Sequence, residues 1–162
     1  MTRLMTAKGL ERCTARVREL ELVVRAVQIK VGEMTTQSNE TWHDNAPYDT
    51  LVQELGIQNQ RLTEAHDAVR DYTIRPYPTA IPSKRVCYGS KVLLRRDSEK
   101  LDLKIVGFGD SDYEQGRVLY TSPIAIALMD HAEGESFRAV INKVKSFITI
   151  EQVSPITDPD LI

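Results

Sequence analysis

Two apolar stripes with the spacing of a coiled coil occupy the first half of the chain. In the first stripe, apolar side chains recur at alternating steps of three and four residues: Leu10, Cys13, Val17, Leu20, Val24, Val27, Val31 and Met34. The second stripe keeps the same alternation, with one polar interruption at Gln58: Tyr48, Leu51, Leu55, Gln58, Leu62, Ala65, Val69 and Tyr72. This spacing is that of a heptad seam, so it predicts two long helices.

The two stripes match in length and are separated by a short segment. At about 1.5 Å per residue, each seam extends roughly 36 Å, which is more than a small globular core requires. A short connection favours packing the second helix antiparallel against the first. The sequence therefore predicts an α-helical coiled-coil hairpin over residues 1–74, with its tip near residues 38–49.

A proline-rich linker, residues 75–87, follows the hairpin. Its prolines Pro76, Pro78 and Pro82 prevent a helix from continuing and favour extended backbone. Beyond the linker, glycines and polar clusters separate short runs that are typical of β-strands. These runs cover residues 91–96, 101–106, 117–120, 137–141 and 147–153.

A short helix is predicted among these strands. Ser122 is a good helix cap and Pro123 suits a first helical turn, so residues 124–129 should be helical. We expect an α+β chain in which residues 88–153 form a small twisted antiparallel sheet with one short helix. Residues 154–162 should form a loose tail, and Asp110, Asp112 and Glu114 should lie in a solvated loop.

The overall composition excludes several classes of protein. A formal net charge of -2 in 162 residues gives no electrostatic footprint for binding nucleic acid. The longest apolar stretches are shorter than the roughly 20 residues that span a bilayer, and the start of the chain is charged rather than signal-like. We expect a cytoplasmic protein with no membrane contact, in which Cys13 and Cys87 are reduced core residues rather than a disulfide.

The hairpin is polarised in charge. Between Val31 and Gln60 there are five acids and neither lysine nor arginine, whereas the first helix is rich in arginine. In a structural interpretation, Asp44 or Asn45 only caps the second helix. In a functional one, carboxylates at the end of a rigid rod enter a cavity of another molecule and help to bind Mg²⁺, a cation that prefers oxygen ligands. His43 would support that chemistry by orienting water.

Four segments resemble one known family in order and spacing. Three of them are similar to the strands and the short helix of that family: Tyr88–Val92, Lys104–Gly107 and Ser122–Ala125. The fourth, Met5–Glu11, is similar to the start of its first helix. The family is that of the bacterial Gre transcript-cleavage factors, and the resemblance spans nearly the whole chain. It implies that the C-terminal domain is FKBP-like.

The resemblance also implies a function. Gre factors dock their globular domain on the rim of the secondary channel of RNA polymerase, here through Ser122, Pro123, Ile124 and Ala125. The coiled coil then enters the channel, and its tip carboxylates help to hold Mg²⁺ where the polymerase hydrolyses the 3′ end of a backtracked RNA. The polymerase is the enzyme, so the chain is expected to be an accessory factor with no stably bound cofactor. Because the two apolar stripes of the hairpin pack against each other, they give no reason to dimerise, and we expect a monomer.

The tip residues match the family in part. Asp44, followed by Asn45-Ala46 and Tyr48, matches the family sequence Glu-Asn-Ala-x-Tyr with aspartate in place of glutamate. Thr41 stands where the family has a second acid, and Glu40 is the adjacent carboxylate that could replace it. Two alternatives therefore stay open: a Gre-like channel regulator without cleavage activity, and a coiled-coil adaptor for a protein other than polymerase.

Overall fold

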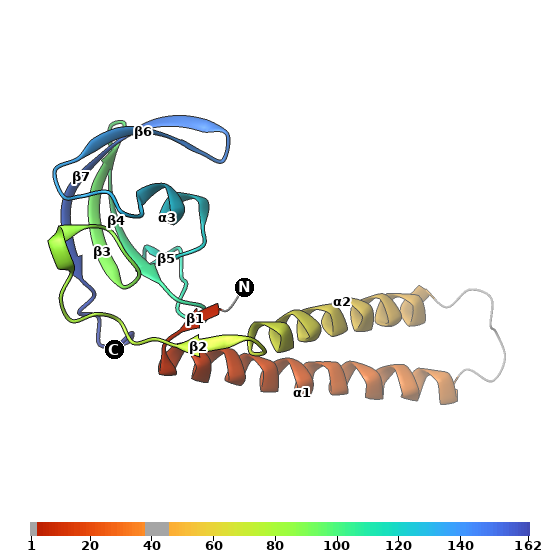
Figure 1. Cartoon of the computed structure of the whole chain (residues 1–162). Coiled ribbons are helices and arrows are strands. Elements are labelled where there is room, and N and C mark those ends of the chain that lie inside the picture. The colour runs from red at the N-terminus through yellow and green to blue at the C-terminus, as the bar shows by residue number, and fades with distance from the viewer. Residues whose placement is uncertain (1–2, 38–45) are drawn as a thin grey trace. The chain divides into compact units, whose positions relative to one another are not determined.

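The computed structural model describes residues 3–37 and 46–162, apart from the side chain of Gln37 (Figure 1). The chain forms two compact units, one of Met1–Arg12 with Tyr72–Ile162 and the other of Cys13–Asp71. We call them the globular unit and the hairpin unit. The sequence placed residues 1–12 in the hairpin, but the structure groups them with the globular unit. Within the described ranges, no helix is long and apolar enough to cross a membrane.

The predicted helical hairpin is confirmed. Helix α1 (Ala7–Gln37) and helix α2 (Ala46–Ala68) run in opposite directions, and Glu21 of α1 pairs with His66 of α2 at 3.6 Å. The buried residues of α1 beyond Arg12 all belong to the first stripe: Val17, Leu20, Val24 and Val27. On α2 the second stripe is half-buried rather than fully buried, from Tyr48 to Ala65. Heptad spacing alone therefore located the contact face of both helices.

The globular unit is built on a five-stranded sheet in the order β5-β4-β3-β7-β6. All five predicted strands are present, as β3 (Ser90–Arg96), β4 (Glu99–Val106), β5 (Arg117–Leu119), β6 (Ser136–Ile141) and β7 (Val144–Pro155). Neighbouring strands are antiparallel except for β4 and β5, which pair in parallel. The sheet is thus mixed at one edge rather than wholly antiparallel.

The predicted short helix is α3 (Pro123–Leu128), and Ser122 caps it by accepting a hydrogen bond from the backbone N–H of Ala125 at 3.3 Å. Ala125 and Leu128 of this helix are fully buried against the sheet. They complete a core that also contains Val92, Leu94, Ile105, Ile148 and Ile150. Both cysteines are free, as the sequence suggested, but they are half-buried rather than residues of the core.

Two short strands and a 3-10 helix were not predicted. Strand β1 (Arg3–Met5) pairs in parallel with β2 (Tyr72–Ile74), and the 3-10 helix η1 (Pro82–Lys84) lies within the proline-rich segment. Three residues are too few to establish a period, so such elements leave no readable pattern. The pairing of β1 with β2 explains why the start of the chain belongs to the globular unit.

The predicted loose tail is wrong. Ile156 and Leu161 are only 3% and 1% exposed, and they pack with Val106 and the half-buried Tyr77. The prolines and aspartates of residues 154–162 suggested a solvated terminus, because two apolar residues five positions apart give no periodic signal. The last residues are instead a structural part of the globular unit.

This packing gives a matched test on adjacent residues. We expect Leu161→Ala to lower the free energy of unfolding of the globular unit by roughly 2–4 kcal/mol, since it removes a fully buried side chain. Ile162→Ala should change it by less than about 0.5 kcal/mol, because Ile162 is 65% exposed. Urea unfolding followed by the near-ultraviolet circular dichroism of the tyrosines measures both. Equal effects of the two substitutions would contradict the packed terminus.

Candidate functional site

The predicted tip residues lie outside the part of the chain that the structure describes. Glu40, Thr41, His43 and Asp44 all fall between α1 and α2, in residues 38–45. Their proposed roles therefore stay predictions. Across the described ranges, no group of three histidine, cysteine, aspartate or glutamate side chains is arranged to hold a metal ion.

The four residues predicted to bind polymerase differ in exposure. Ser122 and Ala125 are buried, at 8% and 0%, Ile124 is half-buried, and Pro123 is exposed. The first two therefore hold α3 in place from inside and offer little surface to a partner. Ile126, which sequence reasoning omitted, is 62% exposed and lies three positions from Pro123, on the same face of the helix. Helical spacing from Pro123 was the signal that could have found it.

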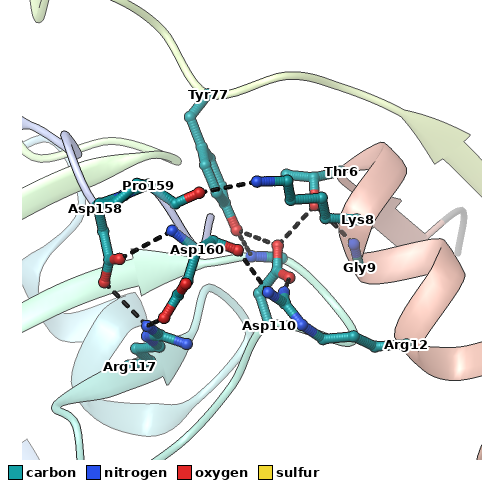
Figure 2. Close-up of polar contacts among 11 residues, drawn as sticks. Thr6, Lys8, Gly9, Arg12, Tyr77, Asp110, Arg117, Asp158, Pro159 and Asp160 are labelled. Atoms are coloured by element: carbon teal, nitrogen blue, oxygen red, sulfur yellow. Dashed lines mark hydrogen bonds and ion pairs between the residues drawn. The ribbon is translucent and has the colours of Figure 1, made fainter. Parts of the chain in front are cut away.

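A buried carboxylate, that of Asp110, joins a cluster of hydrogen bonds in the globular unit (Figure 2). The side chain of Asp110 is fully buried, and its Oδ2 accepts hydrogen bonds from Thr6 Oγ1 and Tyr77 Oη, both at 2.7 Å. The guanidinium of Arg12 pairs with Oδ1. The prediction that Asp110 lies in a solvated loop is therefore wrong. A buried carboxylate is tolerated only when it is paired and hydrogen-bonded, and here both oxygens are occupied.

The first turn of α1 is shaped to meet this carboxylate. The Thr6 hydroxyl accepts a hydrogen bond from the backbone N–H of Gly9 at 2.8 Å, so the same group caps the helix and donates to Asp110. A Cβ at Gly9 would lie 2.6 Å from the carbonyl oxygen of Phe108, which is too close for any side chain. Glycine at this position therefore lets the helix start close to the Phe108 backbone.

Tyr77 joins the same cluster from the proline-rich segment. Its hydroxyl donates to Asp110 and accepts from the backbone N–H of Gly107 at 3.0 Å. Burial raises the pKa of Tyr77 far above its usual range, and the hydrogen bond to Asp110 raises it further. Burial also raises the pKa of Tyr88 to about 12, and the Tyr88 hydroxyl donates to the carbonyl of Arg75 at 3.0 Å. Both phenols therefore stay neutral and act as hydrogen-bond donors.

The C-terminal segment is fixed by a second cluster of charges. Asp158 Oδ2 lies 2.9 Å from both Lys104 Nζ and Arg117 Nη2, and Arg117 is itself buried. The hydrogen bond from Lys104 is the main cause that lowers the pKa of Asp158 to about 2. Lys8 Nζ also donates to the carbonyl of Pro159 at 2.7 Å. These charges neutralise one another within the fold, so the cluster has a structural role rather than a catalytic one.

Comparison with known proteins gives consistent matches. The family model described as "Transcription elongation factor, GreA/GreB, C-term" matches residues 81–155. Transcription elongation factor GreA of Mycoplasmoides gallisepticum is 30% identical over 152 residues, which are 93% of this chain and 94% of that protein. GreA of Syntrophotalea carbinolica is 29% identical over 83% of this chain and 85% of its own. The crystal structure of GreA factor homolog 1 of Thermus thermophilus matches 94% of this chain and 99% of its own, at 17% identity and a TM-score of 0.46.

The Asp110 cluster predicts the effect of a single hydroxyl. We expect Tyr77→Phe to lower the free energy of unfolding of the globular unit by about 1–3 kcal/mol, since it leaves the Gly107 N–H and one Asp110 lone pair without a partner. Tyr113→Phe removes the same group from a residue that is 73% exposed and should be neutral within about 0.5 kcal/mol. Urea unfolding measures both values, and a neutral Tyr77→Phe would contradict the assigned bonds.

The Asp158 cluster predicts a dependence on pH. The pKa of Asp158 is lowered from 3.8 to about 2 in the folded protein. Its contribution to the free energy of unfolding is therefore full above about pH 4 and is lost as the pH falls towards 2. Because solvent screens this partly exposed group, we expect that contribution to be roughly 1 kcal/mol. Urea unfolding between pH 2 and 6 should show a shallower pH dependence for Asp158→Asn. The exposed control Glu99→Gln should keep the slope of the parent protein in that window.

Proposed function

We propose that this chain, which belongs to the GreA/GreB family of transcription elongation factors, enters the secondary channel of RNA polymerase. There it stimulates the polymerase's own cleavage of backtracked transcripts. The family membership rests on a relative that is 30% identical along 93% of the chain. The observation that carries the finer proposal is the composition of the hairpin end. Five carboxylates lie between Val31 and Gln60 with no lysine or arginine among them.

The hairpin has dimensions that suit insertion into a deep channel. Helix α1 has 31 residues, which at about 1.5 Å per residue makes a rod of about 46 Å. Its apolar seam is buried at Val17, Leu20, Val24 and Val27. Rods of this kind can carry their end groups well away from the body of a protein.

The globular unit offers an apolar contact for docking. The α3 surface, which we define as Pro123, Ile124 and Ile126, projects from the helix with Pro123 and Ile126 exposed. Ser122 and Ala125 support that surface, the first by capping the helix and the second by packing beneath it. An exposed apolar helix face on a rigid support suits a protein partner such as the channel rim.

Asp44 and Glu40 are the side chains that would act at the polymerase active site. Carboxylate oxygens are the donors that Mg²⁺ prefers, so their chemistry fits a metal shared with the polymerase. The bound Mg²⁺ would supply an activated water for phosphodiester hydrolysis. Asp44 would be the principal ligand, and His43 would orient the water. The family has a second acid where this chain has Thr41, and Glu40 would supply that second carboxylate instead. No stably bound cofactor is required.

The Thr41 position favours one alternative function. A single carboxylate holds a divalent cation less well than a pair, so a chain with threonine here could occupy the channel and regulate transcription without cleavage. In the adaptor hypothesis, the hairpin binds a protein other than polymerase. That hypothesis requires that this chain does not bind polymerase at all.

Cleavage can be tested directly on a halted, backtracked elongation complex with Mg²⁺. We expect the protein to accelerate shortening of the RNA from its 3′ end, and both Asp44→Ala and Asp44→Ser to lower that acceleration by at least about tenfold, which is 1.4 kcal/mol in the activation barrier. Serine keeps the capping ability of aspartate but not its charge. Glu54→Gln, an acid outside the tip, should have little effect.

The other outcomes separate the alternatives. Full activity of Asp44→Ser would mean that this residue only caps α2. Polymerase binding that competes with a cleavage-active Gre factor, without RNA shortening, would favour the channel regulator. Failure to bind polymerase would leave the adaptor. Pro123→Glu, at an exposed position, should weaken polymerase binding without changing the helical content of the hairpin.

A further inference from the structure

The hairpin of β6 and β7 carries an exposed surface that neither the core nor the proposed function uses. We define this β6–β7 surface as Arg138, Val140, Lys145 and Phe147. In the strand register Arg138 is opposite Phe147, and Val140 is opposite Lys145. Val140 is 64% exposed and Phe147 is 49% exposed. A hollow of about 380 Å³ is lined by these four residues together with Ala139 and Ser146.

The part of this hairpin around its turn carries charges of one sign. Residues 136–150 contain the cations Arg138, Lys143 and Lys145 and not a single aspartate or glutamate. Within the described residues, none of these three side chains forms a hydrogen bond or an ion pair. Of the acids around these residues, Asp97 accepts a hydrogen bond from the backbone N–H of Phe147, and Glu151 of β7 pairs with Arg95. The surface therefore offers unpaired positive charge beside apolar side chains.

The backbone of β6 is available as well. Strand β6 is the last strand of the sheet order and has β7 as its only strand neighbour in the described structure. No backbone hydrogen bond joins Ser136–Ile141 to any described segment other than β7. An antiparallel edge strand keeps every second N–H and C=O directed outward, where an added strand can pair with them.

We propose that the free edge of β6 and the β6–β7 surface bind an extended acidic segment of a partner protein by strand addition. A peptide that pairs with β6 presents alternate side chains to the exposed face. Its carboxylates would meet Arg138 and Lys145, and its apolar side chains would meet Val140 and Phe147. Because only every second side chain of the added strand faces this surface, the surface selects an extended sequence in which acidic and apolar residues take turns at every second position.

Two simpler roles for the β6–β7 hairpin would require only part of these features. Charged side chains on an edge strand can serve only to prevent unwanted pairing, but such a role does not require an exposed phenylalanine and a hollow beside it. Nucleic acid also binds lysine and arginine, but it gains nothing from the unpaired backbone of β6. The edge and the apolar side chains together favour a peptide.

The probe is a nine-residue peptide in which serine occupies every second position and glutamate and valine take turns at the positions between, added to the full-length ¹⁵N-labelled protein. We expect saturable NMR shifts and slower amide exchange confined to β6 and β7, and weaker binding as salt rises from 0.05 to 0.5 M, because salt screens the charges. Arg138→Glu combined with Lys145→Glu should lower the affinity at least tenfold without changing the melting temperature, since both positions are exposed. Lys30→Glu, an exposed cation on α1, should leave the affinity unchanged.

Matched probes decide the interpretation. A peptide with lysine in place of glutamate, and the acidic peptide N-methylated at alternate amides, should both fail to bind, the second because it cannot pair with an edge strand. The proposal is overturned if the acidic peptide does not bind at 1 mM, if either control peptide binds equally well, or if the shifts lie elsewhere. Tighter binding of a uridine decamer to the same residues would overturn it in favour of nucleic acid. None of these outcomes depends on cleavage activity.

Discussion

The carboxylate of Asp110 is the interaction on which the globular unit most depends. It joins three segments that are far apart in the sequence: the first turns of α1 through Thr6 and Arg12, the proline-rich segment through Tyr77, and the loop that precedes β5. Removing a buried charge from water is costly, so the carboxylate is stable only while all of these groups are in place. The cost of leaving it unpaired forces the segments to assemble together.

The same principle explains why the C-terminal residues are ordered. Residues 154–162 contain two prolines and two aspartates, a composition typical of solvated termini. Asp158, however, pairs with the cations Lys104 and Arg117, and Leu161 packs with Val106 and Ile156. The sequence of the terminus cannot show this, because its partners lie more than 40 residues away. The segment is ordered by charge pairing and burial with residues far away in the sequence. The local propensity of its prolines and aspartates favours an irregular, solvated backbone instead.

Elements with a local signal were predictable and elements without one were not. The hairpin, the five strands of the main sheet and the capped helix α3 each follow from a period or a capping pattern within a few residues. The pairing of β1 with β2 and the burial of Asp110 depend on contacts across the chain, and neither leaves a local pattern. The α3 surface shows both cases: the Ser-Pro start of the helix was readable, but the exposure of Ile126 and the burial of Ala125 depend on how the helix packs on the sheet.

Overall charge is a poor guide to what this protein binds, because its charges are segregated along the chain. The formal net charge of -2 averages an acidic stretch, between Val31 and Gln60, with a basic one, residues 136–150. Electrostatic interactions fall off within about 10 Å at ordinary salt, so a partner responds to the local sign rather than to the sum. A stretch of carboxylates without lysine or arginine among them can share a metal ion, and a strand edge whose cations have no ion-pair partner can bind an acidic chain. Excluding nucleic acid on net charge alone is therefore valid only for the molecule as a whole, and each surface has to be judged by the charges within its own Debye length.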